Sequence, residues 1–148
     1  MIKQNRTRFG AGVALAMMMT FGVSASEAGE GDAAYRKLVM ASVGAHMKSI
    51  ATIIKGKVAH SGDLTLHANA MRDLSKMAGH VFPKDSEGGN ALPILWEKPD
   101  DLAAALKAFQ SAAGNFAEVA AAGDAGLYGA ALGGLGKSCK GCHSQFKK

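Results

Sequence analysis

Residues 124–148 read DAGLYGAALGGLGKSCKGCHSQFKK and place the two cysteines of the chain, Cys139 and Cys142, directly before His143. Positions three and four residues apart lie on one face of a helix, so the two thiols can address one group bound beside this segment. The stretch also contains six glycines: Gly126, Gly129, Gly133, Gly134, Gly136 and Gly141. Each glycine costs a helix about 1 kcal/mol relative to alanine. A large flat ligand packed against bare backbone would offset that cost.

The pattern C-x-x-C-H is the attachment motif of c-type haem. Each thiol can add to one vinyl group of the porphyrin, and the adjacent histidine can bind the iron axially. Three other uses of the cysteines were weighed. A thioredoxin-like pair needs a βαβ setting, a zinc site needs a second ligand pair, and a disulfide across two residues stabilises little. One covalent haem c, held by Cys139, Cys142 and His143, is the favoured interpretation.

Three amphipathic helices are predicted before this segment. They span about residues 32–54, 63–79 and 99–122, and the last helix runs from about residue 124 almost to the end. Asp32 suits the start of the first helix, and Ser61 or Asp63 that of the second. No segment alternates between apolar and polar residues as a strand would. The pattern predicts an all-α protein, an antiparallel four-helix bundle that encloses the haem.

The connection between the second and third helices is long. Residues 80–99, HVFPKDSEGGNALPILWEKP, contain all three prolines of the chain and several large apolar side chains. Long loops in compact domains are mostly functional or packed over another part of the protein. We therefore expect this loop to be ordered.

The N-terminus is typical of a cleaved export signal. Lys3, Arg6 and Arg8 precede an apolar stretch of about fifteen residues and small residues suited to cleavage, predicted after Ala25. Residues 1–25 are then the signal peptide and residues 26–148 the mature domain, located in the periplasm. Without the three basic leader residues, 14 basic residues face 12 acidic ones. This balance does not indicate nucleic-acid binding, and no membrane attachment is expected after cleavage.

With these features the whole mature chain resembles class II cytochromes c, the family of cytochrome c′ and its low-spin, methionine-ligated relatives. The haem motif lies at the C-terminus, and Tyr35-Arg36-Lys37 lies in the first helix. The middle loop contributes Phe82-Pro83, Glu87-Gly88-Gly89 and residues 91–96. The cytochrome c-556 type is the most similar branch.

The resemblance assigns roles to several residues. It implies thioether bonds at Cys139 and Cys142 and proximal iron ligation by His143. It places Arg36 near the haem propionates, where a fixed guanidinium suits carboxylates, and Trp96 over a haem edge. Arg36 as a solvated helix charge and Trp96 as ordinary core stay open as alternatives.

Met40 occupies the position that faces the iron on the distal side in this family. High-spin members have an apolar residue there and five-coordinate iron, whereas low-spin members use a first-helix methionine as the sixth ligand. Met40 is therefore the predicted second axial ligand, with ordinary core packing as the alternative. Other candidates weighed for the role are Met47, Met71, Met77, His46, His67 and His80.

The favoured function is electron transfer in the periplasm, with His143 and Met40 on the iron and redox proteins as partners. The alternative is a high-spin cytochrome c′ that binds nitric oxide or other small gases at an open distal site. Many family members carry arginine four residues after the haem histidine, but Lys147 stands here, which mildly favours electron transfer. No enzymatic activity is expected. The family often forms homodimers through its first two helices.

Overall fold

The computed structural model describes residues 25–148, so nearly all of the predicted leader lies outside the described residues. The helices, in chain order, are α1 (Ala25–Ile54), the 3₁₀ turn η1 (Ser61–Asp63), α2 (Leu64–Ala78), α3 (Ile94–Glu97), α4 (Pro99–Ala122) and α5 (Ala125–Phe146). Within this described part, β structure is limited to one isolated bridge between Ala91 and Lys147.

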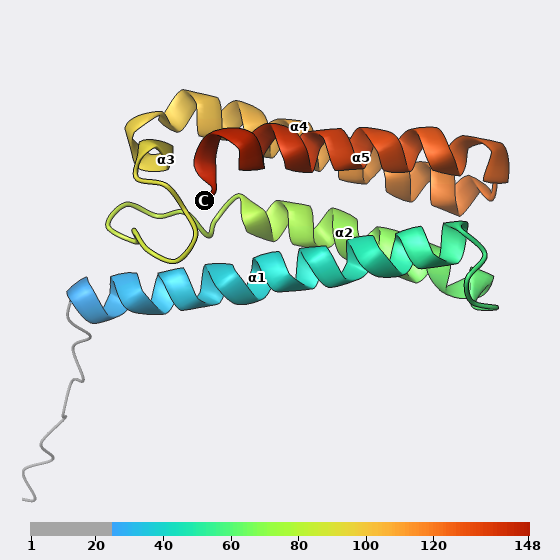
Figure 1. Ribbon diagram of the computed structural model, residues 1–148, viewed down its shortest axis with the longest axis horizontal. Coiled ribbons are helices and arrows are strands. Elements are labelled where there is room, and N and C mark those ends of the chain that lie inside the picture. Colours follow the sequence, from blue (N-terminus) through green and yellow to red (C-terminus); the bar gives the residue numbers. More distant parts are fainter. Residues whose placement is uncertain (1–24) are drawn as a thin grey trace, which may run out of the picture.

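The four long helices form an antiparallel bundle, which confirms the predicted fold class. Helix α1 packs along α2, α2 along α4 and α4 along α5, whereas α1 and α5 approach each other much less. Figure 1 shows α4 and α5 as one layer above α1 and α2. The side between α1 and α5 is therefore the least closed side of the bundle.

The bundle core draws buried side chains from all four long helices. Its members include Val43 and Ile50 of α1, Met71 of α2, Phe116 of α4 and Leu135 of α5. A second cluster, which we call the loop cluster, consists of Leu95, Leu102 and Phe146. It joins α3, the first turns of α4 and the end of α5, and so supports the part of the molecule that contains the cysteines.

Helix α1 begins seven residues before the predicted start at Asp32. The added turns cover the middle loop, and Gly29 is buried there. A Cβ atom on Gly29 would collide with the backbone carbonyl of Asp85. Only glycine permits so close an approach of two backbones, so tertiary packing extends the helix beyond its local start signal.

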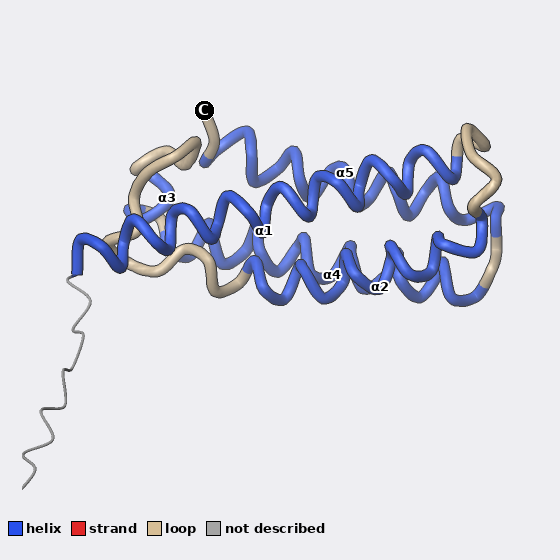
Figure 2. Tube along the Cα trace, turned by 90° about the horizontal axis from the view of Figure 1, so that it is seen from below, coloured by secondary structure: helices blue, strands red, loops and turns tan. Residues whose placement is uncertain are grey.

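The middle loop is ordered, as expected, and contains the short helix α3, which the sequence analysis did not predict. It lies at the same end of the bundle as the C-terminus (Figure 2). The Leu92 N–H donates to the Phe146 carbonyl at 2.9 Å, and the Lys148 N–H donates to the Asn90 carbonyl at 3.0 Å. The loop and the end of α5 are thus bonded into one unit.

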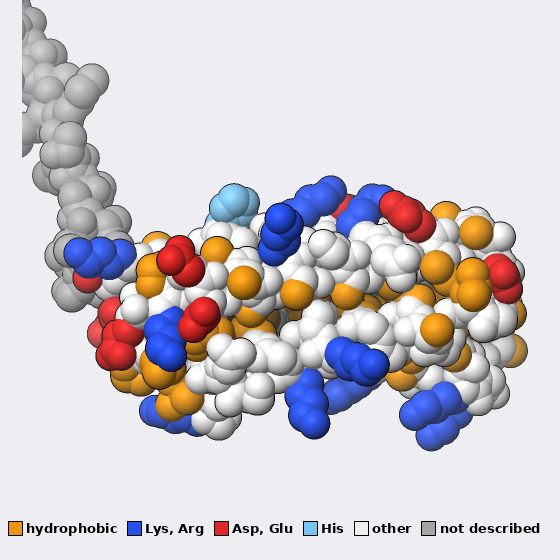
Figure 3. Space-filling view, turned by 90° about the horizontal axis from the view of Figure 1, so that it is seen from above, with side chains coloured by type: hydrophobic (Ala, Val, Ile, Leu, Met, Phe, Trp, Pro, Cys, Tyr) orange, Lys and Arg blue, Asp and Glu red, His pale blue; other side chains and the backbone are white. Residues whose placement is uncertain are grey.

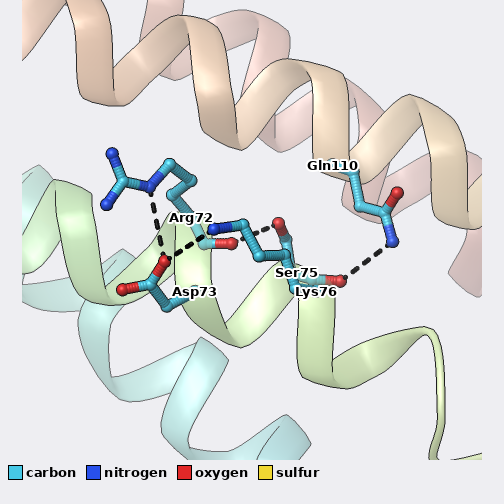
Figure 4. A network of polar contacts seen from close by, with 5 residues as sticks. All are labelled: Arg72, Asp73, Ser75, Lys76 and Gln110. Carbon is cyan, nitrogen blue, oxygen red and sulfur yellow. Dashed lines mark hydrogen bonds and ion pairs between the residues drawn. The ribbon is translucent and has the colours of Figure 1, made fainter.

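Figure 4 shows polar contacts of α2 that lie within the helix or join it to α4. Asp73 accepts hydrogen bonds from Arg72 and Lys76, and the Gln110 side chain of α4 donates to the Ser75 carbonyl at 3.4 Å (Figure 4). The charged side chains in this network are largely exposed, and exposed ion pairs contribute little stability, at most ~1 kcal/mol each. The bundle depends on its apolar core instead.

The described surface is charged in scattered places. On the face in Figure 3, lysine and arginine side chains lie in small groups, with acidic and apolar side chains between the groups. This pattern lacks the continuous basic stripe that a nucleic-acid-binding face shows. Among residues 25–148, none of the helices combines the length and hydropathy that crossing a bilayer requires.

Candidate haem site

Helix α5 presents the cysteines and the histidine from a segment fixed at both ends. At its start, the Asp124 side chain accepts a hydrogen bond from the Gly126 N–H at 2.9 Å, which is an N-cap. At its end, Phe146 is buried in the loop cluster, and the Lys147 N–H donates to the His143 carbonyl at 3.2 Å. These contacts hold the C-x-x-C-H motif in helical geometry.

The two thiols are free, half-buried, and directed at different apolar clusters. Cys139 packs against the bundle core, and Cys142 packs against the loop cluster. Burial raises the pKa of both thiols, and the neighbouring Cys139 adds to the shift at Cys142. Two thiols on one helix that reach separate apolar surfaces suit a flat apolar ligand that touches both.

His143 directly follows the second thiol on α5, and its side chain is exposed. Partial loss of solvent around the ring lowers its pKa, and the charge of Lys147 lowers it further. The neutral imidazole is the form that binds a metal. Two thiols that can add to vinyl groups and one imidazole nitrogen that can bind iron are the groups that attached haem requires, so the residues present fit this cofactor.

The contact between α1 and α5 sets the level of Met40. A Cβ on Gly136 would lie 3.7 Å from the Cε of Met47, so these two positions face each other. Met40 precedes Met47 by seven residues, and His143 follows Gly136 by seven. At 1.5 Å per residue, each lies ~10 Å along its helix from this contact. Because the two helices are antiparallel, Met40 and His143 stand at the same level.

The surroundings of Met40 are apolar. Its side chain is half-buried and packs against the bundle core beside Met47, while Val43 and Met71 are buried in that core. Of the methionines weighed as alternatives, Met77 is 39% exposed, on the outside of α2. The structure therefore brings Met40, Met47 and Met71 into one apolar region and leaves Met77 out of it.

Arg36 is buried and organises the middle loop. Its guanidinium donates to the Val81 carbonyl at 3.2 Å and to the Ser86 carbonyl at 2.8 Å. It also donates to the Ser86 hydroxyl at 3.0 Å and to the Gly88 carbonyl at 3.2 Å. Burial lowers its pKa, which the charges of Asp32 and Glu87 partly offset. The alternative of a solvated helix charge is wrong, because loop oxygens surround this side chain.

Trp96 lies beside Arg36. The guanidinium carbon is 5.3 Å from the Trp96 ring centroid and 5.5 Å from that of Phe82, within cation–π range. The indole N–H donates to the Pro83 carbonyl at 2.9 Å. Trp96 also packs against the loop cluster, as Cys142 does. Arg36, Trp96 and Cys142 therefore belong to one end of the bundle.

The glycines of α5 have different surroundings. Gly136 faces α1, and Gly126 contacts the capping Asp124, but a Cβ on Gly129, Gly133 or Gly141 would meet open space. Close approach by another helix of the described protein therefore accounts for Gly136 alone among these glycines. Ser86 is a further residue of this region that its sequence did not reveal. Its hydroxyl accepts a hydrogen bond from Arg36 and donates one to the Pro83 carbonyl at 2.7 Å. A serine before paired glycines is too common a pattern to reveal such a role.

Comparison with known proteins agrees with this geometry. The family model described as "Cytochrome C'" matches residues 32–147. The cytochrome c′ of Pararhodospirillum photometricum is 33% identical over 117 residues, which cover 77% of this chain and 94% of the relative. That of Rhodospirillum rubrum is 32% identical over 116 residues, which cover 76% and 79%.

Solved structures give the same answer. The ferrous form of a cytochrome c′ variant from Alcaligenes xylosoxidans with bound nitric oxide superposes with a TM-score of 0.76 and 27% identity. The superposition covers 81% of this chain and 95% of that one. This chain therefore belongs to the cytochrome c′ family, and its cofactor is a covalently bound haem c.

Proposed function

We propose that this chain is an exported haem protein that binds nitric oxide, or another small diatomic gas, at the distal face of its haem. The supporting observation is its likeness to cytochrome c′ structures that contain nitric oxide, which extends over 81% of the chain. The predicted leader, with cleavage after Ala25, would deliver the protein to the periplasm. Bacterial c-type haem is attached in that compartment.

In this proposal α5 holds the haem from one side. The sulfurs of Cys139 and Cys142 would form thioether bonds to the two vinyl groups, and each S–H hydrogen would go to a vinyl carbon. His143 would bind the iron. The half-buried position of both thiols supports this assignment. The bound haem supplies an iron that cycles between Fe(III) and Fe(II) and binds small ligands.

The distal side is formed by α1 and α2. Met40 stands level with His143 and packs against the apolar core cluster that contains Val43 and Met71, as Met47 also does. A small neutral diatomic molecule loses little hydration in such surroundings, whereas an anion or a polar molecule loses much more. The composition of this wall therefore favours a gas as the ligand.

Electron transfer with His143 and Met40 as axial ligands is the second candidate. The level of Met40 opposite His143 favours it, because a thioether on α1 at this level could bind an iron that His143 holds. Methionine ligation stabilises the reduced iron and raises the reduction potential. The chain would then resemble the low-spin branch and exchange electrons with redox proteins. Arg36 near the propionates and Trp96 at a haem edge belong to both candidates.

A homodimer is part of the proposal. Helix α1 exposes Tyr35 and Leu38, and α2 exposes Leu66; the exposed fractions are 49%, 66% and 68%. The resemblance implies a homodimer through the first two helices, and these exposed apolar side chains lie on those two helices. Sedimentation velocity of the wild type and of Leu38→Lys tests this. A wild type that sediments as a monomer at high concentration contradicts the dimer.

Absorption spectra test the two functional candidates. Ferric and ferrous protein are recorded with and without nitric oxide, for the wild type, Met40→Leu and the matched control Met77→Leu. A high-spin wild type that binds nitric oxide supports the gas-binding proposal. A low-spin wild type with a methionine–iron band that only Met40→Leu removes supports electron transfer. A low-spin spectrum that Met40→Leu leaves unchanged refutes the distal role of Met40.

A further inference from the structure

Two histidines on neighbouring helices face each other across the α1–α2 contact. His46 of α1 and His67 of α2 are both half-buried. Their Nδ1 atoms are 2.9 Å apart, their ring centroids are 5.0 Å apart, and the rings are inclined at 65°. The same nitrogen of each ring thus points at the other across the α1–α2 contact, a pairing that the haem site does not use.

The distance between the nitrogens matches chelation of one metal ion. Metal–imidazole bonds are about 2.0–2.1 Å long. Two such bonds at a right angle place their nitrogens ~2.9 Å apart, and at a tetrahedral angle ~3.3 Å apart. The observed 2.9 Å therefore agrees best with neighbouring ligands in a square-planar or octahedral arrangement. Cu(II) and Ni(II) prefer tetragonal coordination by nitrogen and oxygen.

The protonation state of His46 also suits a metal. Burial lowers the pKa of His46, and the neighbouring His67 lowers it further. Both effects favour the neutral imidazole, which is the form that binds metals. When one ring donates to the other, the pair forms a single hydrogen bond. When both Nδ1 atoms are unprotonated, two lone pairs face each other, and a cation relieves their repulsion.

We propose that His46 and His67 form a second metal site, which takes a divalent transition-metal ion of the copper(II) type between α1 and α2. Among residues 25–148, no cluster of three histidine, cysteine or carboxylate groups that could hold a metal is present, so the two imidazoles would be the protein ligands and water would complete the coordination. Copper(II) leads the general order of affinity for such ligands. The bound ion would join two helices of the distal wall, at a position one residue from Met47 on α1.

Calorimetric titration of the ferric, haem-loaded protein with copper(II) chloride tests the site. Ferric iron is chosen so that copper is not reduced during the experiment. The variants are His46→Gln and His67→Gln, and the matched control is His80→Gln, which alters an exposed histidine at the end of α2. Circular dichroism without metal checks that each variant folds as the wild type does.

The wild type is expected to bind one copper ion per chain and to unfold at a higher temperature when copper is present. Either single variant should weaken this binding at least tenfold, while the control stays within twofold of the wild type. The copper signal in electron paramagnetic resonance should show two nitrogen ligands. The proposal is overturned if both variants bind as the wild type does, or if one copper binds per two chains. Neither result depends on the gas ligand or the axial ligand of the haem.

Discussion

Replacement of Arg36 by alanine is expected to destabilise the protein strongly and to loosen the middle loop. The guanidinium makes four hydrogen bonds to loop oxygens and lies against two aromatic rings. Alanine removes all of them at once. The carbonyls of Val81, Ser86 and Gly88 then lose this donor.

The magnitude follows from the bonds that are lost. A hydrogen bond to a charged group contributes about 1.5–3 kcal/mol, and a cation–π contact about 0.5–2 kcal/mol. These values do not add fully, because desolvation of the buried guanidinium opposes them. Loss of one partner from a buried charged network typically costs ~3–5 kcal/mol, which we expect for Arg36→Ala. Arg36→Lys should cost about 2 kcal/mol, because a lysine ammonium has three donors without the planar fork.

Urea unfolding of the haem-loaded protein, followed by circular dichroism, measures these changes at an unchanged m-value. Lys37→Ala is the matched control, because the exposed neighbour should change stability by no more than ~0.5 kcal/mol. Hydrogen exchange gives a local readout. The amides of Leu92 and Lys148, which bond the loop to the end of α5, should exchange faster in Arg36→Ala. A loss below ~1 kcal/mol with unchanged exchange would refute the reasoning.

Three further substitutions test the packing by thermal or urea unfolding. Gly29→Ala should destabilise by ~1–3 kcal/mol because its Cβ meets the Asp85 backbone; a gain in stability, as helix propensity alone predicts, would contradict that contact. Asp124→Ala should cost about 1 kcal/mol through loss of the N-cap, and an unchanged midpoint would mean that the cap does not form. Phe116→Ala should cost about 3–5 kcal/mol; exposed Leu66→Ala is its control, and similar losses for both would count against the bundle core.

The sequence predicted the helices whose ends carry local signals. Residues 99–122 were predicted as a helix, and α4 spans Pro99–Ala122, with Gly123 in the left-handed conformation at its end. Proline at the start and glycine after the end act within one turn, so the sequence alone reveals them. The start of α1 was wrong because a contact with Asp85, more than fifty residues away, extends that helix. Helix α3 was not predicted because four residues are too few to show the spacing of apolar side chains that marks a helix.

In the candidate site, too, some residues could be predicted from the local sequence, whereas others depend on contacts between distant segments. Cys139, Cys142 and His143 are neighbours in sequence, so their spacing alone predicts a haem c protein. The partners of Arg36 are mostly backbone carbonyls, which every residue has and which leave no trace in a sequence. The pairing of His46 with His67 depends on how α1 meets α2. That register comes from packing of the whole bundle.

Whether Met40 could reach a haem iron depends on how far apart α1 and α5 lie, on the least closed side of the bundle. A methionine side chain has three rotatable bonds, so it can reach a ligand or fold back into the core without moving its helix. Which of the two occurs depends on the distance between α1 and α5. Arg36 lies one turn before Met40, is bonded to the middle loop, and the loop is bonded to the end of α5. The loop therefore links α1, one turn before Met40, to the end of α5, and we expect its geometry to set the distance between these two helices.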